Sequence, residues 1–257
     1  MSDNNVKVLQ NGSSHILYDA SLIDQPIDKH VQQLFSFSRG PVDGDVSEKE
    51  KKLSSQATGI GRAPVKFFPF QDLRLVLKHY YRGGFVAKII SDWYVGFQLE
   101  KTRAYREWCL LRTMRNLTLP VPKPVAARVI KKAWFYQADL ITVEIEQSET
   151  LADYLMHQAI SDLLWQNIGC CLQRFHSHNI FHADLNARNI LLQKCDKAEA
   201  NVFLIDFDRG DIRPGGHRWK RDNLARLKRS LEKFKRNHER FYFDENDWQR
   251  LLTGYEG

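Results

Sequence analysis

The sequence predicts an α+β fold of two lobes, in which strands dominate the first half of the chain and helices the second. Apolar residues come in short strand-like runs up to about residue 146 and recur at helical spacing afterwards. The 257 residues are enough for one large domain or two lobes. We therefore expect an N-terminal extension at residues 1–56, a first lobe at 57–146 and a second lobe at 147–257.

The first lobe is expected to be built from paired strands. A hairpin is predicted within residues 6–18, because Asn11 and Gly12 form a turn signal between two runs. Residues 65–70 and 73–78 predict a strand pair, and residues 125–130 and 134–145 predict further strands. A helix is predicted over 102–116, and it is ended by Pro120 and Pro122.

The second lobe is expected to be mainly helical. Ser161 is a candidate N-cap for a helix with a regular apolar stripe. Its members are Leu163, Leu164, Ile168, Cys171, Leu172 and Phe175. Short strands are predicted on both sides of residues 182–189, and another strand at 202–205 is followed by Asp206. A further helix with an apolar stripe is expected over 219–236.

Charge and composition limit the class of partner and the compartment. The formal net charge is +7 and the isoelectric point is about 9.2, which favours an anionic partner. Residues 218–240 hold ten Lys or Arg against three acidic residues. The helix predicted over these residues either packs on the body of the protein and leaves a solvated basic face, or forms a docking surface for anionic lipid. Nucleic acid is not expected, since no binding motif is present.

The cysteines and the hydropathy indicate a reducing compartment and no spanning helix. The four cysteines form no CxxC pair, so we expect reduced thiols. The first ten residues lack an apolar core, and no apolar run approaches the roughly 20 residues of a membrane span. We expect any contact with a membrane to be from its surface. The sequence carries no pattern that sets an oligomeric state.

Three polar residues in the second lobe have the chemistry of phosphoryl transfer. Asp184 and Asn189 lie five residues apart in a loop between predicted strands, and Asp206 follows an apolar strand. A carboxylate at Asp184 would serve as the base for an attacking hydroxyl. Oxygen atoms of Asn189 and Asp206 would suit Mg²⁺. Alone, an Asp and Asn at this spacing are more often an ordinary turn.

The first lobe supplies candidates for binding a nucleotide such as ATP. Val76 and Lys78 share one face of a predicted strand, which would offer an apolar patch for a base and an ammonium for phosphates. Glu107, on the predicted helix, is the expected partner of Lys78. Gly59 and Gly61 would allow the backbone to approach the phosphates.

The order of these features resembles that of protein kinases. His182 to Asn189, HADLNARN, resembles the catalytic loop H-x-D-L-x-x-x-N, and IDFD at 205–208 resembles the D-F-G motif. The resemblance implies a bilobal protein-kinase-like fold with an antiparallel-sheet N-lobe. It also implies that His182 packs under the loop rather than reacting. About fifty residues follow Asp208, so the C-lobe is expected to be shortened.

Further segments of the chain are YRGG at 81–84, LPVPKPVAAR at 119–128 and ADLIT at 138–142. Together with the catalytic loop, these segments resemble the 3-deoxy-D-manno-octulosonic acid (Kdo) kinase family of Gram-negative bacteria more closely than protein kinases. The resemblance implies ATP-dependent phosphorylation of the 4-hydroxyl of Kdo on a lipid A precursor, Kdo-lipid IVA. It also implies a peripheral location at the cytoplasmic face of the inner membrane and a part in lipopolysaccharide biosynthesis.

The sequence departs from the protein-kinase pattern at three positions. Ala183 replaces the Arg of H-R-D, Asn186 stands where many protein kinases carry Lys or Ala, and Asp208 replaces the Gly of D-F-G. With no A-P-E sequence either, a protein substrate is disfavoured. Other acceptors, such as an aminoglycoside or choline, a protein substrate and a pseudokinase-like scaffold remain alternatives. Four arginines could contact an anion or be structural: Arg82, Arg128, Arg188 and Arg209.

Overall fold

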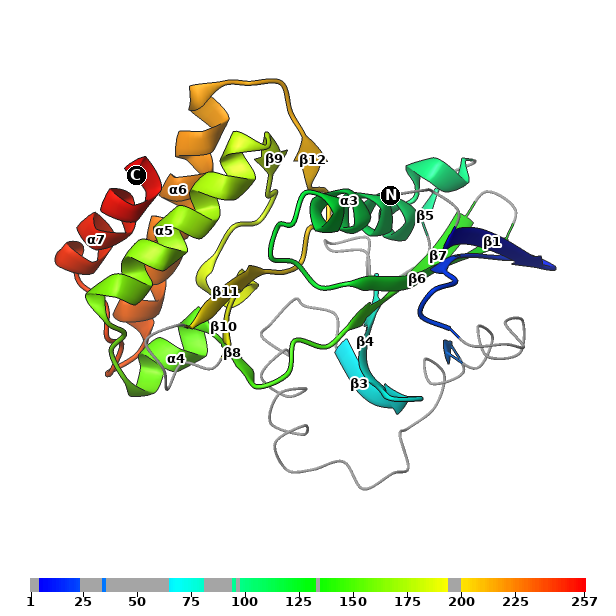
Figure 1. The fold of residues 1–257 in the computed structure, drawn as a ribbon, viewed down its shortest axis with the longest axis horizontal. Helices are drawn as coiled ribbons and strands as arrows, with labels where there is room; N and C mark the ends of the chain where they lie inside the picture. The colour runs from blue at the N-terminus through cyan, green and yellow to red at the C-terminus, as the bar shows by residue number, and fades with distance from the viewer. Residues whose placement is uncertain are drawn as a thin grey trace. The chain divides into compact units, whose positions relative to one another are not determined.

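The computed structural model describes residues 5–23, 34–35, 65–80, 94–95, 98–132, 135–193 and 200–257 (Figure 1). The chain divides into two compact units. The first comprises Met1–Cys109 and Lys123–Glu144, and the second comprises Leu110–Pro122 and Ile145–Gly257. The lobe boundaries given by the sequence stay a prediction, because most residues between 24 and 64 lie outside the described ranges.

The first unit is built on a seven-stranded sheet in the order β1-β2-β6-β7-β4-β3, with β5 also paired to β7. Every pairing in it is antiparallel. The strands are β1 (Val6–Asn11), β2 (Ser14–Asp19), β3 (Val65–Phe70), β4 (Leu73–His79), β5 (Tyr94–Val95), β6 (Pro124–Lys132) and β7 (Phe135–Val143).

The two predicted strand pairs of this unit are confirmed. β1 and β2 form a hairpin in which Gly12 takes a left-handed backbone, with φ of +56°. A residue without a Cβ adopts this conformation at little cost. β3 pairs with β4 as expected, and β4 lies between β3 and β7. β2 also pairs with β6, so the hairpin belongs to the sheet.

Alternation along β4 fixes which side chains enter the core. Leu75 and Leu77 are fully buried in a cluster with Ile16, Val125 and Ile141. Because successive side chains of a strand point to opposite faces, Val76 and Lys78 share the other face. A short 3₁₀ turn, η4 (Leu99–Lys101), leads into α3 (Arg103–Asn116), which confirms the predicted helix.

The described residues of the second unit contain four further helices and two small sheets. The helices are α4 (Leu151–His157), α5 (Asp162–Ser177), α6 (His217–Asn237) and α7 (Glu245–Glu256). β10 (Ile190–Gln193) pairs with β8 (Ser148–Thr150) and β11 (Asn201–Leu204), and β9 (Ile180–Phe181) pairs with β12 (Asp211–Ile212). None of the helices in the described ranges is both long and apolar enough to cross a bilayer.

α5 largely follows its predicted pattern. The Ser161 side chain accepts a hydrogen bond from the backbone N–H of Leu164, which confirms the N-cap. The expected stripe is buried except for Leu163, which is 51% exposed, so its inclusion was wrong. Leu163 lies two turns before the exposed Cys170, on the outward face.

α5 and α7 approach each other closely through glycines. A Cβ on Gly169 would collide with the backbone oxygen of Leu251, and one on Gly254 would collide with the backbone of Gln166. α7 starts with a capping box, in which the side chains of Asp244 and Asp247 each accept a bond from the other's backbone N–H. The two helices therefore pack backbone against backbone.

Candidate active site

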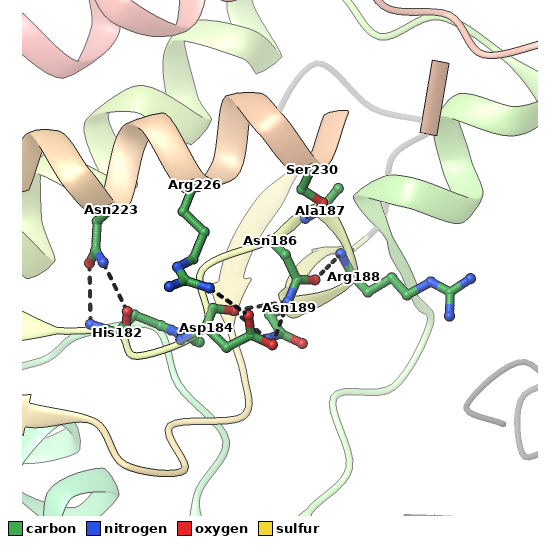
Figure 2. Close-up of polar contacts among 9 residues, drawn as sticks. All are labelled: His182, Asp184, Asn186, Ala187, Arg188, Asn189, Asn223, Arg226 and Ser230. Carbon is green, nitrogen blue, oxygen red and sulfur yellow. Dashed lines mark hydrogen bonds and ion pairs between the residues drawn. The ribbon is translucent and has the colours of Figure 1, made fainter. Parts of the chain in front are cut away.

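The loop that carries Asp184 lies between β9 and β10 and is held by two carboxamides (Figure 2). Asn186 Nδ2 donates to the backbone oxygen of Asp184 at 2.9 Å, and Asn189 Nδ2 donates to the same oxygen at 2.8 Å. Asn186 Oδ1 accepts from the N–H of Arg188 and caps the 3₁₀ turn η5 (Ala187–Asn189). The loop is thus fixed from within, while the Asp184 side chain is 56% exposed.

His182 joins this loop to the segment around Asp206. Its Nδ1 accepts from the N–H of Asp184 at 3.2 Å, so Nε2 carries the proton and donates to the backbone oxygen of Ile205 at 2.9 Å. The ring is buried against Phe207, with 4.6 Å between centroids. The structural role expected of His182 is confirmed.

Asp206 takes an uncommon backbone conformation two residues after the end of β11. Its φ is +63°, a left-handed value that non-glycine residues rarely adopt. The neighbours on both sides hold it there: Ile205 N–H donates to the backbone oxygen of Asn189 at 3.0 Å, and Phe207 is buried and stacked on Phe175. Strain held by surrounding structure is typical of functional sites.

Asn189 and Asp206 each offer an oxygen of the kind that Mg²⁺ prefers. The Asn189 amide nitrogen is bound to Asp184, which turns its oxygen away and leaves an oxygen donor at a buried position. The half-buried Asp206 adds a carboxylate, and the backbone bond from Ile205 ties the two segments together. Oxygen ligands with few carboxylates are what Mg²⁺ takes beside phosphates. Within the described ranges, no three His, Cys, Asp or Glu gather as a metal cluster by themselves.

In the first unit, the structure brings Lys78 and Glu107 together. Lys78 Nζ lies 3.1 and 2.9 Å from the two carboxylate oxygens of Glu107, whose side chain is only 3% exposed. The Tyr80 hydroxyl donates to Glu107 as well, and its ring lies 4.8 Å from Lys78 Nζ. Val76 is half-buried on the face that also carries Lys78. Gly59 and Gly61 lie outside the described residues.

Arg128 forms an ion pair with a buried carboxylate of the first unit. Its Nε and Nη2 lie 2.8 and 2.6 Å from one carboxylate oxygen of the buried Asp139, and His79 Nδ1 pairs with the other oxygen. Burial alone would raise the pKa of Asp139, but the bond from His79 and the charge of Arg128 lower it below its ordinary value.

The sequence also left the roles of Arg188, Arg209 and Arg82 undecided. Arg188 lies over the ring of Phe234 at 5.2 Å and points away from Asp184 (Figure 2). Arg209 is exposed and has a left-handed backbone. Arg82 lies outside the part of the chain that the structure describes.

Two residues that contact the predicted site residues, Tyr80 and Arg226, were not predicted from the sequence. Tyr80 follows Lys78 by two positions, so strand alternation could have found it. Arg226, whose Nη1 is 3.5 Å from Asp184 Oδ1, comes from α6, 42 residues along the chain, and no local pattern marks it.

The fold of the protein is that of the kinase-like class. A solved structure, titled "WaaP in complex with acyl carrier protein", superposes with a TM-score of 0.55. The match covers 91% of this chain and 87% of that chain at 16% identity. The likeness confirms the predicted α+β, kinase-like fold.

Sequence comparison identifies the family. The model of the lipopolysaccharide kinase (Kdo/WaaP) family matches residues 49–255. A 3-deoxy-D-manno-octulosonic acid kinase of Mannheimia succiniciproducens is 40% identical over 214 residues, covering 81% of this chain and 87% of the relative. One from Vibrio vulnificus is 34% identical over 247 residues, covering 96% and 97%. The chain belongs to the lipopolysaccharide kinase (Kdo/WaaP) family and is a kinase, as the sequence resemblance predicted.

Proposed function

We propose that this kinase transfers the γ-phosphoryl group of ATP to the 4-hydroxyl of a Kdo residue on Kdo-lipid IVA, in assembly of the inner core of lipopolysaccharide. Kdo is the acceptor named for relatives that match 81% and 96% of the chain, and the protein is a Kdo kinase on that basis. We further propose that the 4-hydroxyl of Kdo is phosphorylated and that the Kdo belongs to Kdo-lipid IVA. The observation that carries it is the exposed Asp184 carboxylate on a loop that is rigidly bonded beneath it.

Asp184 acts as the general base. It accepts the proton of the acceptor hydroxyl as that oxygen forms its bond to the γ-phosphorus, and the bond to the leaving oxygen of ADP breaks. A positioned base contributes about 10²–10⁴-fold in rate. Asn186 and Asn189 keep the backbone of Asp184 fixed, so its carboxylate needs little reorganisation on binding.

Asn189 and Asp206 are the residues that would hold Mg²⁺, and the ion would supply positive charge to the nucleotide phosphates. Lys78 would bind the α- and β-phosphates, and Glu107 would fix the direction of its ammonium. Val76 would contact the adenine base. Gly59 and Gly61 would cover the phosphates, as the sequence predicts.

The protein works as a peripheral enzyme at the cytoplasmic face of the inner membrane. Support comes from the exposed arginines toward the two ends of α6, Arg218, Arg221 and Arg236. The opposite side of the helix packs through Leu224, Leu227 and Leu231. Each basic residue near an anionic lipid surface contributes about 1 kcal/mol, so a few contacts give reversible docking.

The test is transfer from labelled ATP with Mg²⁺ to Kdo-lipid IVA in a neutral detergent. We expect label on the lipid with the native protein and a loss of about 10²–10⁴-fold with Asp184→Ala. Glu239→Ala, which removes an exposed carboxylate just after the end of α6, is the matched control and should keep full activity.

Two outcomes would contradict the proposal. If the native protein binds ATP but labels no lipid, the acceptor is wrong. If the lipid is labelled but the phosphate is found by NMR on another hydroxyl of Kdo, the 4-position is wrong.

A further inference from the structure

Three polar residues of α6 face the catalytic loop in register. Asn223, Arg226 and Ser230 stand at positions i, i+3 and i+7, which lie on one side of a helix (Figure 2). They meet the loop at His182, Asp184 and Ala187, in the same order along the loop.

The two outer contacts anchor the helix to the loop. The buried side chain of Asn223 bonds both backbone groups of His182: its Oδ1 accepts from the N–H at 3.3 Å and its Nδ2 donates to the oxygen at 2.9 Å. Ser230 Oγ accepts from the N–H of Ala187 at 3.2 Å. These bonds satisfy backbone groups on both sides of Asp184, so they fix the place of Arg226 as well.

The middle contact is of a different kind. Arg226 Nη1 lies 3.5 Å from Asp184 Oδ1, and the two side chains are 49% and 56% exposed. A single long contact between exposed charges contributes about 0–1 kcal/mol to stability. The anchors already hold α6, so Arg226 adds little to the fold. Its guanidinium instead stays beside the base and open to solvent.

Phosphoryl transfer needs positive charge at this place. Negative charge spreads over the three equatorial oxygens of the transferring group, and preorganised donors there lower the barrier. Asn186, two residues after the base, is neutral, although many protein kinases carry Lys at that position. The guanidinium of Arg226 carries a permanent charge and presents donors in a planar fork that fits phosphate oxygens.

We propose that Arg226 is a catalytic residue that binds the equatorial oxygens of the transferring phosphoryl group, supplying from α6 the positive charge that the neutral Asn186 does not provide. The inference rests on the proposed function for its reaction class, phosphoryl transfer at Asp184, and not for its acceptor. Arg226 exchanges no proton or electron pair in the step. It donates hydrogen bonds, and its contact with Asp184 is replaced by one with the phosphoryl group.

The experiment compares Arg226→Ala with Arg229→Ala, which removes an exposed arginine one turn further along α6. Both are assayed for lipid phosphorylation in neutral detergent and for the slow hydrolysis of ATP to ADP without acceptor. Arg226→Ala should lower kcat by about 10²-fold with little change in either KM. Arg229→Ala should match the native protein.

Rescue and the conservative variant separate a catalytic role from a structural one. Guanidinium ion at non-denaturing concentration should restore part of the activity of Arg226→Ala and none of that of Asp184→Ala. Arg226→Lys should retain more activity than Arg226→Ala because it keeps a charge. A native kcat in Arg226→Ala, or an equal loss in Arg229→Ala, would overturn the proposal.

The experiment distinguishes a wrong acceptor from a wrong role for Arg226. If the native protein does not label Kdo-lipid IVA, the proposed function fails. The ratio of ATP hydrolysis between native protein and Arg226→Ala then still decides the role of Arg226. A ratio near one refutes it, and a large ratio with rescue by guanidinium supports it.

Discussion

Glu107 is a nearly fully buried carboxylate, which is costly unless its charge is matched. Three contacts match it: two from Lys78 Nζ and one from the Tyr80 hydroxyl. Such a pair is weak evidence of stability, because hydrophobic residues could often replace it without loss. Its effect here is geometric, since it fixes one direction for the Lys78 ammonium.

Replacing Glu107 with Gln should therefore weaken nucleotide binding more than it weakens the fold. The amide keeps the shape and one acceptor oxygen but removes the charge that holds Lys78. We expect about tenfold weaker affinity for ATP, equivalent to about 1.4 kcal/mol. Titration with a nucleotide and calorimetric readout would measure it, with the exposed Glu100→Gln as control. Unchanged affinity in Glu107→Gln would show that Lys78 does not depend on this partner.

At this scale the sequence indicated the motif residues but not their surroundings. Asp184, Asn189 and Asp206 stand in short contiguous patterns, so a sequence can show them. Arg226 reaches Asp184 only because α6 packs on the loop, and that contact spans 42 residues. The same limit left Arg128 open, since its partner Asp139 lies on the neighbouring strand.

Between elements, His176 links three helices of the second unit. It lies on α5, its Nδ1 is 2.7 Å from the hydroxyl of Tyr255 on α7, and its ring meets the edge of Trp219 on α6 at 5.2 Å. Burial lowers the pKa of His176 from its ordinary 6.5 to about 4. The folded protein therefore keeps this ring neutral at a pH where the unfolded chain would protonate it.

Acid should thus destabilise the protein through His176. Between pH 6.5 and about 4 the unfolded state binds a proton at His176 that the folded state does not bind. The free energy of unfolding therefore decreases as the pH is lowered through this range. The shift corresponds to about 3 kcal/mol over the whole window. Urea unfolding at a series of pH values would measure this slope. We expect His176→Gln to flatten it and the exposed His217→Gln to leave it unchanged; equal slopes in all three proteins would count against the assignment.

Element types were predictable where the apolar period is long. α3, α5, α6 and the paired strands β3 and β4 each carry several periodic residues. The short strand before the catalytic loop was predicted and is present as β9, whereas the two-residue strands β5 and β12 were missed, because two residues show no period and pair only through tertiary contacts. α4 was also missed, although the Thr150 N-cap marks its start.

For the whole molecule, the net charge of +7 predicts binding to anionic membranes that depends on salt. Vesicles with anionic lipid should bind the protein at low ionic strength and release it as the Debye length falls to about 3 Å near 1 M salt. Co-sedimentation would measure the bound fraction. The triple variant Arg218→Ala, Arg221→Ala and Arg236→Ala should bind clearly less. Binding that is equal with neutral vesicles would contradict an electrostatic surface.

The order of the strands in the sheet could not be predicted from the sequence. The apolar runs predict that strands exist, but not that β4 lies between β7 and β3 or that the early hairpin adds to β6. Those pairings join segments far apart in the chain, and many registers satisfy the same alternation. The resemblance to a known family predicted an antiparallel sheet in the N-lobe, but it did not predict this order of strands.

The close seat of α7 on α5 also has a genetic consequence. Gly169 and Gly254 allow the backbones of α5 and α7 to touch. Without α7, the surface of α5 around Gly169 would lose this contact, and no other side chain could replace it. We expect a premature stop codon just before residue 245 to act as a null allele, with the product degraded rather than merely shortened. Missense changes at codons 169 and 254 should be rare among functional alleles, although neither residue belongs to the candidate active site.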